Sequence, residues 1–431
     1  TEYRNNYAWV SVEHDWSDYA TTRAIGSFTD VTNIRSGRID QIGRIAGPVD
    51  DERAFHIASL QLDGTIEMGR FLNTWGVTAK QLSANYDYRS DVRFEAGYPF
   101  VGSPANDSHR AASLRPDGNE YAAYWSTRVQ LLPQLTTEIG LRWDDETYTN
   151  ADSETQLAPR VSAMYLLPAG QRVRLSWGRF FQSQSINEAL IENEAQHFFP
   201  AQRADQIVLS YEADLPHGRQ LRIEAYRKDY DRLRPHWENL FYPIVLVPEL
   251  EYVPTLVDPD RARAEGIELL LSQRSGQEWT WWVGYAWSQV KDTIDGHEFS
   301  RSWNQRHALT AGVHWSRGRW DVTLAETYHT GWPITPFRLA GSGATAELEI
   351  GARNSVRLDD FNSLDLRVNR SIALGRGELD VFLEVSNLLS QSNACCIEPI
   401  TTRDEQGNVI LDAERSYWLG IVPSIGVLWR Y

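Results

Sequence analysis

The stretch that decides the fold lies near the end of the chain. It reads SLDLRVNRSI at residues 363–372, GRG at 375–377 and ELDVFLEVS at 378–386. In both longer segments apolar residues recur at alternate positions, with polar residues such as Asp365 and Glu384 between them. This period of two predicts a pair of β-strands that each have one apolar face, joined by a tight glycine turn.

The last strand, predicted at residues 417–431, has the same alternation. One face carries Tyr417, Leu419, Ile421, Pro423, Ile425, Val427, Trp429 and Tyr431. Soluble β-sandwiches also contain half-apolar strands, but a final strand that ends on an aromatic residue is typical of outer-membrane barrels. The stretch therefore favours a membrane barrel, in which the terminal Tyr431 would serve barrel assembly.

The composition of the 431 residues supports this fold class. The sequence has no run of about 18 apolar residues that could cross a membrane as a helix, so a spanning chain would have to use strands. The 17 Trp and 19 Tyr residues suit the aromatic girdles that such barrels place at both membrane interfaces. The 42 basic and 58 acidic residues give a net charge of -16, which argues against nucleic acid as a partner.

Alternating segments predict about 17 antiparallel strands. They lie at residues 7–15, 22–29, 53–63, 75–88, 119–131, 134–148, 157–167, 171–181, 204–214, 219–231, 261–274, 278–291, 304–316, 319–330, 363–372, 378–386 and 417–431. In the hairpin at 119–131 and 134–148, one face is apolar and the other carries charges such as Glu120 and Asp144. A charged group in the middle of a bilayer costs about 2 to 4 kcal/mol, so we expect the charged face to line a wet or protein-filled lumen.

The connections between these strands alternate in length. Tight turns rich in Gly and Pro are predicted at residues 132–133, 168–170, 215–218, 275–277, 317–318 and 375–377. Long connections are predicted at 89–118, 182–203, 232–260, 334–360 and 390–416. Short periplasmic turns and long extracellular loops are the layout of an outer-membrane β-barrel, whereas a soluble sandwich has no reason to sort its loops in this way.

The parity of the strands bears on whether the barrel is complete. The last strand ends on the side of the short turns, so counting back through the predicted strands places Thr1 on the side of the long loops. Intact bacterial barrels have an even number of strands with both ends periplasmic, and unpaired strand edges in lipid are costly. We therefore expect residues 1–431 to form the carboxyl-terminal part of one barrel that has lost its start, or else a rare odd-stranded closure.

Short motifs along the chain, in this order, resemble the barrel of the TonB-dependent outer-membrane receptors. They are GRFFQ (178–182), AQRADQ (201–206), YE (211–212), AEGIE (264–268), NQRH (304–307), GWPIT (331–335), LDLR (364–367), EVSNLL (384–389) and Asn393. No single motif is specific, and the resemblance rests on their shared order from residue 53 onward. The family barrel has about 22 strands, so these would be its last ones. We find neither the family's plug domain, nor the energy-coupling segment before it, nor a signal peptide.

The resemblance implies a receptor in the outer membrane of a Gram-negative bacterium. Its function would be TonB-energised uptake of a scarce ligand such as a ferric siderophore. Its partners would be outer-membrane lipid, the plug domain inside the barrel, the TonB complex acting through the plug, and a small-molecule ligand such as an iron chelate. A passive porin-like channel is the alternative, which would conduct ions without a plug. A soluble carbohydrate-binding protein is a further alternative and would stay in water without detergent.

Charged residues on the predicted lumen face are candidates for contact with a plug. The hypothesis covers Arg128, Glu138, Arg142, Arg222, Glu224, Arg367 and Glu384. Charge-assisted hydrogen bonds from these side chains would hold a plug in place. The alternative is that they pair across neighbouring strands and stiffen a wet wall.

Aromatic residues in two long connections are candidates for ligand binding. The first connection contains His236, Trp237, Phe241 and Tyr242, and the second contains His197, Phe198 and Phe199. Aromatic faces beside polar groups suit aromatic or sugar ligands, although aromatic residues near loop bases also serve as girdle residues. The histidines in or beside the loops have no i, i+2 or i, i+4 spacing, so we predict neither a metal site nor a resident cofactor.

The two adjacent cysteines, Cys395 and Cys396, lie in the last long connection. A vicinal disulfide is one hypothesis for an exterior loop. Two free thiols, or pairing with a segment outside this sequence, are the others. The sequence contains no Gly-x-Ser-x-Gly elbow and no phosphate-binding loop, so we do not expect an enzyme.

Overall fold

The computed structural model describes residues 1–149, 155–191, 197–241, 247–252, 254–273 and 278–431. Its regular structure is all-β, with short 3-10 turns at η1 (Pro168–Gly170), η3 (Pro216–Gly218), η4 (Pro248–Leu250) and η5 (Gly343–Thr345). None of the helices in this described part is long and apolar enough to cross a membrane.

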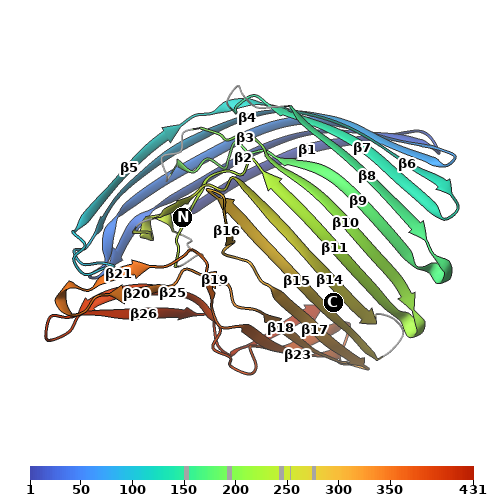
Figure 1. The fold of residues 1–431 in the computed structure, drawn as a ribbon. Coiled ribbons are helices and arrows are strands. Elements are labelled where there is room, and N and C mark those ends of the chain that lie inside the picture. Colours follow the sequence, from blue (N-terminus) through green and yellow to red (C-terminus); the bar gives the residue numbers. More distant parts are fainter. Residues whose placement is uncertain (150–154, 192–196, 242–246, 253, 274–277) are drawn as a thin grey trace.

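One large antiparallel sheet makes up most of the molecule (Figure 1). Its long strands, called the wall strands below, are β1 (Glu2–Ser17), β2 (Ala20–Gln41), β3 (Ile45–Met68), β4 (Phe71–Phe94), β6 (Asp117–Leu132), β7 (Leu135–Glu146), β8 (Gln156–Leu166), β9 (Arg172–Gln182), β10 (Gln202–Leu215), β11 (Arg219–Asp231), β14 (Arg261–Gln273), β15 (Trp279–Ile294), β17 (His307–Arg317), β18 (Trp320–His329), β23 (Phe361–Leu374), β24 (Gly377–Ser386) and β27 (Val422–Arg430). Each predicted strand coincides with one of them, so the strand prediction is confirmed.

Further short strands lie at the long-loop end. Two of them, β5 (Asn106–Leu114) and β16 (His297–Ser300), extend the sheet by pairing with β4 and β15. The others form separate two-stranded hairpins or pairs: β12 (His236–Glu238) with β13 (Thr255–Val257), β19 (Pro333–Ile334) with β22 (Val356–Arg357), β20 (Phe337–Ala340) with β21 (Glu347–Ile350), and β25 (Ala394–Arg403) with β26 (Val409–Tyr417).

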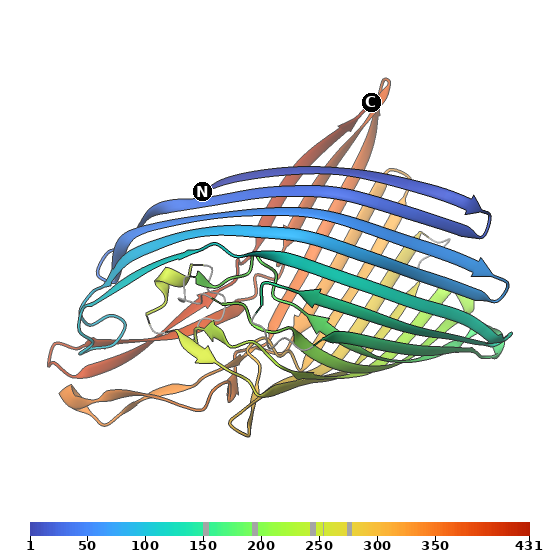
Figure 2. The same cartoon turned by 90° about the horizontal axis from the view of Figure 1, so that it is seen from above.

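Each wall strand pairs with the next wall strand along the chain. Within the described residues, β1 pairs only with β2 and β27 only with β24. Contacts outside the wall strands nevertheless connect the two ends of this series: Arg44 Nη2 lies 3.2 Å from Glu414 Oε2, and the Thr401 backbone amide donates to the Pro99 carbonyl at 3.1 Å. The curved wall therefore partly encloses a lumen, and the loops gather at one end of it (Figure 2).

The two faces of the wall differ as the alternation predicts. On β6 and β7 the outer positions are apolar, and Ile139 remains 54% exposed. The inner positions of the same strands carry Tyr124, Arg128 and Arg142, which line a cavity in the lumen wall. An apolar exterior and a polar interior are what a strand needs when lipid lies on one side and water or protein on the other.

The strands β2, β3 and β4 continue far beyond the predicted boundaries. Sequence periodicity ends these strands near residues 29, 53 and 88, but β2 and β3 remain paired up to Gln41 and Ile45, and β4 runs to Phe94. We call residues 29–41 of β2, 45–57 of β3 and 82–94 of β4, together with β5, the extension. Its pairing is regular, but Arg and Asp residues alternate there with apolar ones, and this obscures the simple pattern that marks a membrane strand.

The main cluster of buried apolar side chains lies on the inner face of the extension. Leu82, Tyr86 and Tyr88 of β4 are buried there. Segments of two long loops pack against them: Ile186, Ala189, Ile191 and Phe198 from the β9–β10 connection, and Leu250 and Tyr252 from the β11–β14 connection. The Tyr86 hydroxyl donates to the Ile186 carbonyl at 2.7 Å and accepts from the Ala189 amide at 3.2 Å. The loops are thus fixed to the wall by a packed core.

Candidate ligand site at the loop end of the barrel

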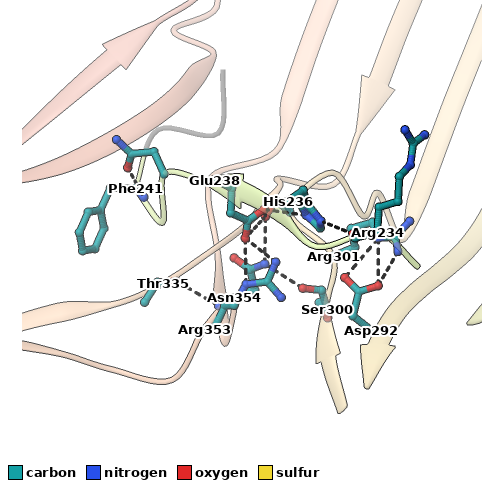
Figure 3. Close-up of polar contacts among 12 residues, drawn as sticks. Arg234, His236, Glu238, Phe241, Asp292, Ser300, Arg301, Thr335, Arg353 and Asn354 are labelled. Carbon is teal, nitrogen blue, oxygen red and sulfur yellow. Dashed lines mark hydrogen bonds and ion pairs between the residues drawn. The ribbon is translucent and has the colours of Figure 1, made fainter. Parts of the chain in front are cut away.

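Three loops meet through the carboxylate of Glu238 (Figure 3). Glu238 ends the short strand β12 and forms an ion pair with Arg353 of the β18–β23 loop, whose Nε donates to Oε1 at 2.9 Å. The Ser302 hydroxyl of the β15–β17 loop lies 3.3 Å from Glu238 Oε2 and accepts from Asn354 Nδ2 at 3.1 Å. Since each loop supplies at least one partner, the three loops are held together as one polar layer.

A second ion pair supports this layer from the end of β15. The Asp292 carboxylate is fully buried, and Arg301 Nε donates to its two oxygens at 3.1 and 3.2 Å (Figure 3). The Asn354 side chain also donates to the Ser300 carbonyl at 2.8 Å, and the Asn354 backbone amide donates to Thr335 Oγ1 at 3.2 Å. A buried carboxylate with such partners fixes the geometry of the loop base, because leaving it unpaired is costly.

A third polar cluster, which we call the latch, fastens the β11–β14 loop to the extension. Arg35 of β2 donates to both Glu249 oxygens at 2.7 and 3.0 Å and to Asp51 Oδ2 at 3.2 Å. The Tyr88 hydroxyl donates to Glu249 Oε1 at 2.7 Å, and Glu249 is 5% exposed. Burial works to raise the pKa of Glu249, but the hydrogen bonds from Arg35 and Tyr88 prevail and lower it. The carboxylate is therefore kept ionised and bound.

An aromatic pocket opens below these loops, on the lumen side of β18, β23, β24 and β27. Its volume is about 490 Å³. The His329 ring stacks on Phe361 at 4.7 Å and 3°, and on Trp332 at 5.8 Å and 15°. Trp418 meets Trp332 edge to face, with ring centroids 6.3 Å apart. Asp365 is the one acidic side chain that lines the pocket, and no lysine or arginine lines it within the described residues.

Two features of the pocket leave room for a ligand. Trp418 is 43% exposed although it lies on the inner side of the wall. The buried Trp332 Nε1 has no hydrogen-bond partner in the described part of the chain. An exposed aromatic face is suited to a ligand that has a flat or apolar surface.

The predicted ligand residues of the β11–β14 loop take separate positions. Trp237 is partly exposed, and the Phe241 ring packs edge to face on Phe337 at 5.5 Å. His236 Nε2 lies 3.9 Å from Glu238 Oε2, so it borders the polar layer (Figure 3). Tyr242 lies outside the described residues. These side chains have open faces near the mouth, but they are not among the residues that line the aromatic pocket.

Of the predicted ligand residues in the β9–β10 loop, His197 is exposed and Phe198 is buried. Phe198 is 4% exposed and packs on Tyr148 at 5.3 Å within the apolar cluster. The expectation that its ring faces a ligand is therefore corrected: the ring has no open face, because the loop uses it to pack on the wall. His197 is exposed and contacts Phe199 edge to face at 4.6 Å.

The predicted plug-facing charges are paired within the wall. Arg128 and Glu138 are direct cross-strand neighbours, with Nη2 2.9 Å from Oε2, and Arg367 pairs with Glu384 in the same way at 2.9 Å. Along single strands, Arg142 binds Asp144 and Arg222 binds Glu224, each at 2.6 Å. All of these residues stand at inner positions. The ladder hypothesis accounts for these contacts, and contact with a plug stays a prediction.

The remaining predicted residues lie near the end of the chain. Cys395 and Cys396 are both buried in β25, with their Sγ atoms 3.1 Å apart. The vicinal disulfide stays a prediction. Tyr431 follows β27 and is fully exposed, and its role in assembly stays a prediction. Across the described ranges, no group of three or more His, Cys, Asp or Glu side chains is placed to hold a metal ion.

Sequence reasoning missed the aromatic pocket and the latch. The pocket had one usable signal: His329 and Phe361 are aromatic residues at positions of the lumen-facing parity, where polar side chains are expected. The latch had none, because Arg35 and Glu249 are separated by 214 residues and only the packed loop brings them together.

Comparison with known proteins identifies the family. The profile of the family described as TonB dependent receptor-like, beta-barrel matches residues 1–388. This chain belongs to that family. The sequence resemblance is confirmed, and so are the outer-membrane location in a Gram-negative bacterium and the expectation that the protein is not an enzyme, since the family consists of transport proteins. A search of curated protein sequences found no match to this chain.

Solved structures of receptors and transporters for ferric compounds share the fold at low sequence identity. The ferric yersiniabactin uptake receptor FyuA from Yersinia pestis has a TM-score of 0.67 and 13% identity, over 99% of this chain and 61% of its own. The ferric citrate transporter FecA in the unliganded form has a TM-score of 0.62 and 14% identity, over 99% of this chain and 61% of its own. The ferripyoverdine receptor of the Pseudomonas aeruginosa outer membrane has a TM-score of 0.58 and 12% identity, over 99% of this chain and 56% of its own. This chain thus spans about three fifths of their length.

Proposed function

We propose that this barrel serves TonB-energised uptake of a scarce small molecule, with the aromatic pocket and the loops above it as the first binding site. The observation that carries the proposal is an aromatic, partly exposed pocket on the lumen side of a TonB-dependent receptor-like barrel, directly below the loops. Lumen walls are normally polar, so an exposed tryptophan there indicates a binding site for a ligand.

The layer of loops favours a receptor over a passive porin-like channel. An open channel needs a clear path, whereas here three loops are joined by Glu238, and a further contact ties the β11–β14 loop to the extension through Arg35. A ligand that enters must contact these loops. In the whole receptor, a plug domain inside the barrel would receive the ligand, and the TonB complex would act on that plug.

Ferric chelates are the ligands to test first, since the neighbouring structures are receptors for ferric yersiniabactin, ferric citrate and ferripyoverdine. The test measures uptake of each radiolabelled chelate by cells that make the full-length receptor, in strains with and without TonB. Uptake that depends on both receptor and TonB is expected. Entry that is independent of TonB, together with ion conductance in planar bilayers, would contradict the proposal and favour the porin-like channel.

The aromatic pocket has its own test within this assay. For the chelate that is taken up, Trp418→Ala should weaken binding to whole cells at least about tenfold, or about 1.4 kcal/mol, because it removes an exposed aromatic face of the pocket. Trp320→Ala is the matched control and should bind normally, because Trp320 lies on the outer face at the start of β18, next to a short turn. Equal affinities of the two variants would exclude the pocket from the binding site.

A further inference from the structure

A second cavity, distinct from the aromatic pocket, lies low on the lumen wall. It has a volume of about 760 Å³ and is lined mainly by inner positions of β6, β7, β8 and β9, and also by Thr74 of β4 and Gln206 of β10. Among the residues that the structure describes, four arginines line it, Arg128, Arg142, Arg160 and Arg174, against one carboxylate, that of Glu138. In a chain with a net charge of -16, such a concentration of positive charge is unexpected.

Two of these arginines are not neutralised. Arg128 and Arg142 pair with Glu138 and Asp144. Arg160 instead lies over the Phe180 ring, with its Cζ 4.7 Å from the centroid, and Arg174 Nη2 contacts the Met164 sulfur at 3.6 Å. Neither guanidinium has a carboxylate partner among the residues that the structure describes. Both side chains are exposed to the lumen, so their donors are free to bind a solute.

A glycine on the strand next to Arg160 makes room for the Arg160 and Phe180 side chains. Arg160 stands between Gly140 and Gly178 on the neighbouring strands, and a side chain at Gly178 would meet the Phe180 ring at 3.1 Å and Arg160 Cγ at 3.3 Å. Ser162 and Ser176 are direct cross-strand partners between the levels of Arg160 and Arg174. The result is a hollow with a guanidinium at each end and two hydroxyl groups in the middle, which we call the basic hollow.

We propose that the basic hollow binds a small polyvalent oxyanion, a phosphate or a polycarboxylate, from the solution in the lumen. Guanidinium groups donate two parallel hydrogen bonds to such oxygens, and serine hydroxyls add further donors. The Phe180 ring holds the Arg160 guanidinium in place without neutralising it. This inference goes beyond the proposed function, because binding of an anion by the wall requires neither TonB nor the outer loops.

Isothermal titration calorimetry on the detergent-solubilised 431-residue chain tests the site. Inorganic pyrophosphate and citrate are the probes, each titrated at constant ionic strength. Saturable binding of at least one probe is expected. Arg160→Gln and Arg174→Gln should each weaken it at least about tenfold, or about 1.4 kcal/mol, and Arg160→Lys should weaken it less because it keeps the charge.

Control measurements separate binding from folding. Arg376→Gln, in the exposed turn between β23 and β24, removes the same charge away from the cavity and should bind like the unchanged chain. The heat-induced gel shift of each variant reports whether the barrel is folded. Absence of saturable binding to the unchanged chain, or equal affinity in the folded Arg160→Gln, Arg174→Gln double variant, would overturn the site. Binding of a pentaglutamate peptide but of neither probe would assign the hollow to protein carboxylates and also overturn the solute assignment.

Discussion

The two halves of β4 show how one strand can reverse the polarity of its faces. In the lower half, Trp75 and Val77 point outward, and Thr78 and Lys80 point to the lumen. In the upper half, which belongs to the extension, Asp87 and Arg89 point outward, and Tyr86 and Tyr88 are buried on the inner face. The strand itself is unbroken between the two halves.

This difference shows that the surroundings set the pattern of a strand at each height. Below, lipid lies outside and a wet lumen inside, so apolar side chains point outward. Above, water lies outside and packed loops lie inside, so apolar side chains point inward, as in a soluble protein. Substitutions at equivalent positions in the two halves should therefore have opposite consequences.

The largest expected effect is at the latch of the extension. Arg35→Met leaves the buried Glu249 carboxylate without its main partner, and breaking a buried pair costs about 3 to 5 kcal/mol. Hydrogen exchange of residues 247–252 should become faster, while exchange in the lower half of β4 stays unchanged. The double variant Arg35→Met, Glu249→Met should recover much of this protection. If the single and double variants exchange equally fast, the ion pair does not hold the loop.

The next effect is expected in the membrane-spanning half. Ile139→Arg places a charge on the lipid-facing side of β7 and should lower the free energy of unfolding by about 2 to 4 kcal/mol. Ser36→Arg places the same charge on the outer face of the extension, opposite Asp50, and should change stability little. Urea titration of barrels refolded into lipid vesicles measures both. Similar losses for the two variants would contradict the assigned position of the membrane.

A smaller effect is expected from the Tyr86 hydroxyl. Tyr86→Phe keeps the ring in the core but leaves the Ile186 carbonyl and the Ala189 amide without their partner, which costs about 1 to 3 kcal/mol. Limited proteolysis of the β9–β10 loop should become faster in this variant. Tyr165→Phe, on the outer face of β8, is the control and should leave the rate of cleavage unchanged.

The smallest effect concerns pH, and it should have opposite signs at two loop contacts. The pKa of Glu249 is lowered, so the stability it contributes is present above the ordinary carboxyl pKa and is lost as pH falls through the lowered value. Burial, aided by Glu414 and opposed by Arg44, raises the pKa of Glu398 in β25. Its contribution is therefore present at low pH and is lost as pH rises through the raised value.

Hydrogen exchange at two pH values, corrected for the intrinsic rate, checks this difference. On acidification, residues 247–252 should lose protection, while residues in β25 and β26 should gain it. Glu398→Gln should remove the pH dependence of the β25–β26 hairpin alone. A loss of protection in both regions at low pH would contradict the assigned directions.

The wall could be predicted from the sequence because its information is local. Alternation of apolar and polar residues, as in Leu364 to Val368, and tight glycine turns such as Gly375 to Gly377 are enough to place the strands and to sort their two faces. The same rule failed for the extension, because apolar residues there lie on the inner face instead of the outer face. The alternation of apolar and polar residues is therefore interrupted between Ala79 and Leu82.

The candidate site could be predicted only in part, because it depends on loops that meet through distant partners. Phe198 was expected at a ligand site, but only the packed structure reveals that Tyr148 covers its ring. The partners of Glu238 lie 64 and 115 residues further along the chain. The aromatic pocket combines ends of four strands, and no local pattern relates Trp332 to Trp418.

The reversal of polarity along β4 also fixes how deeply the protein sits. Outward apolar residues end at Ala79, and inward buried residues begin at Leu82. If the barrel sank by two residues, charged groups such as Asp87 would approach the acyl chains; if it rose by the same amount, Val77 would meet water. This reversal of polarity therefore sets the depth of the barrel in the bilayer, and the loop end is held at one height above the membrane.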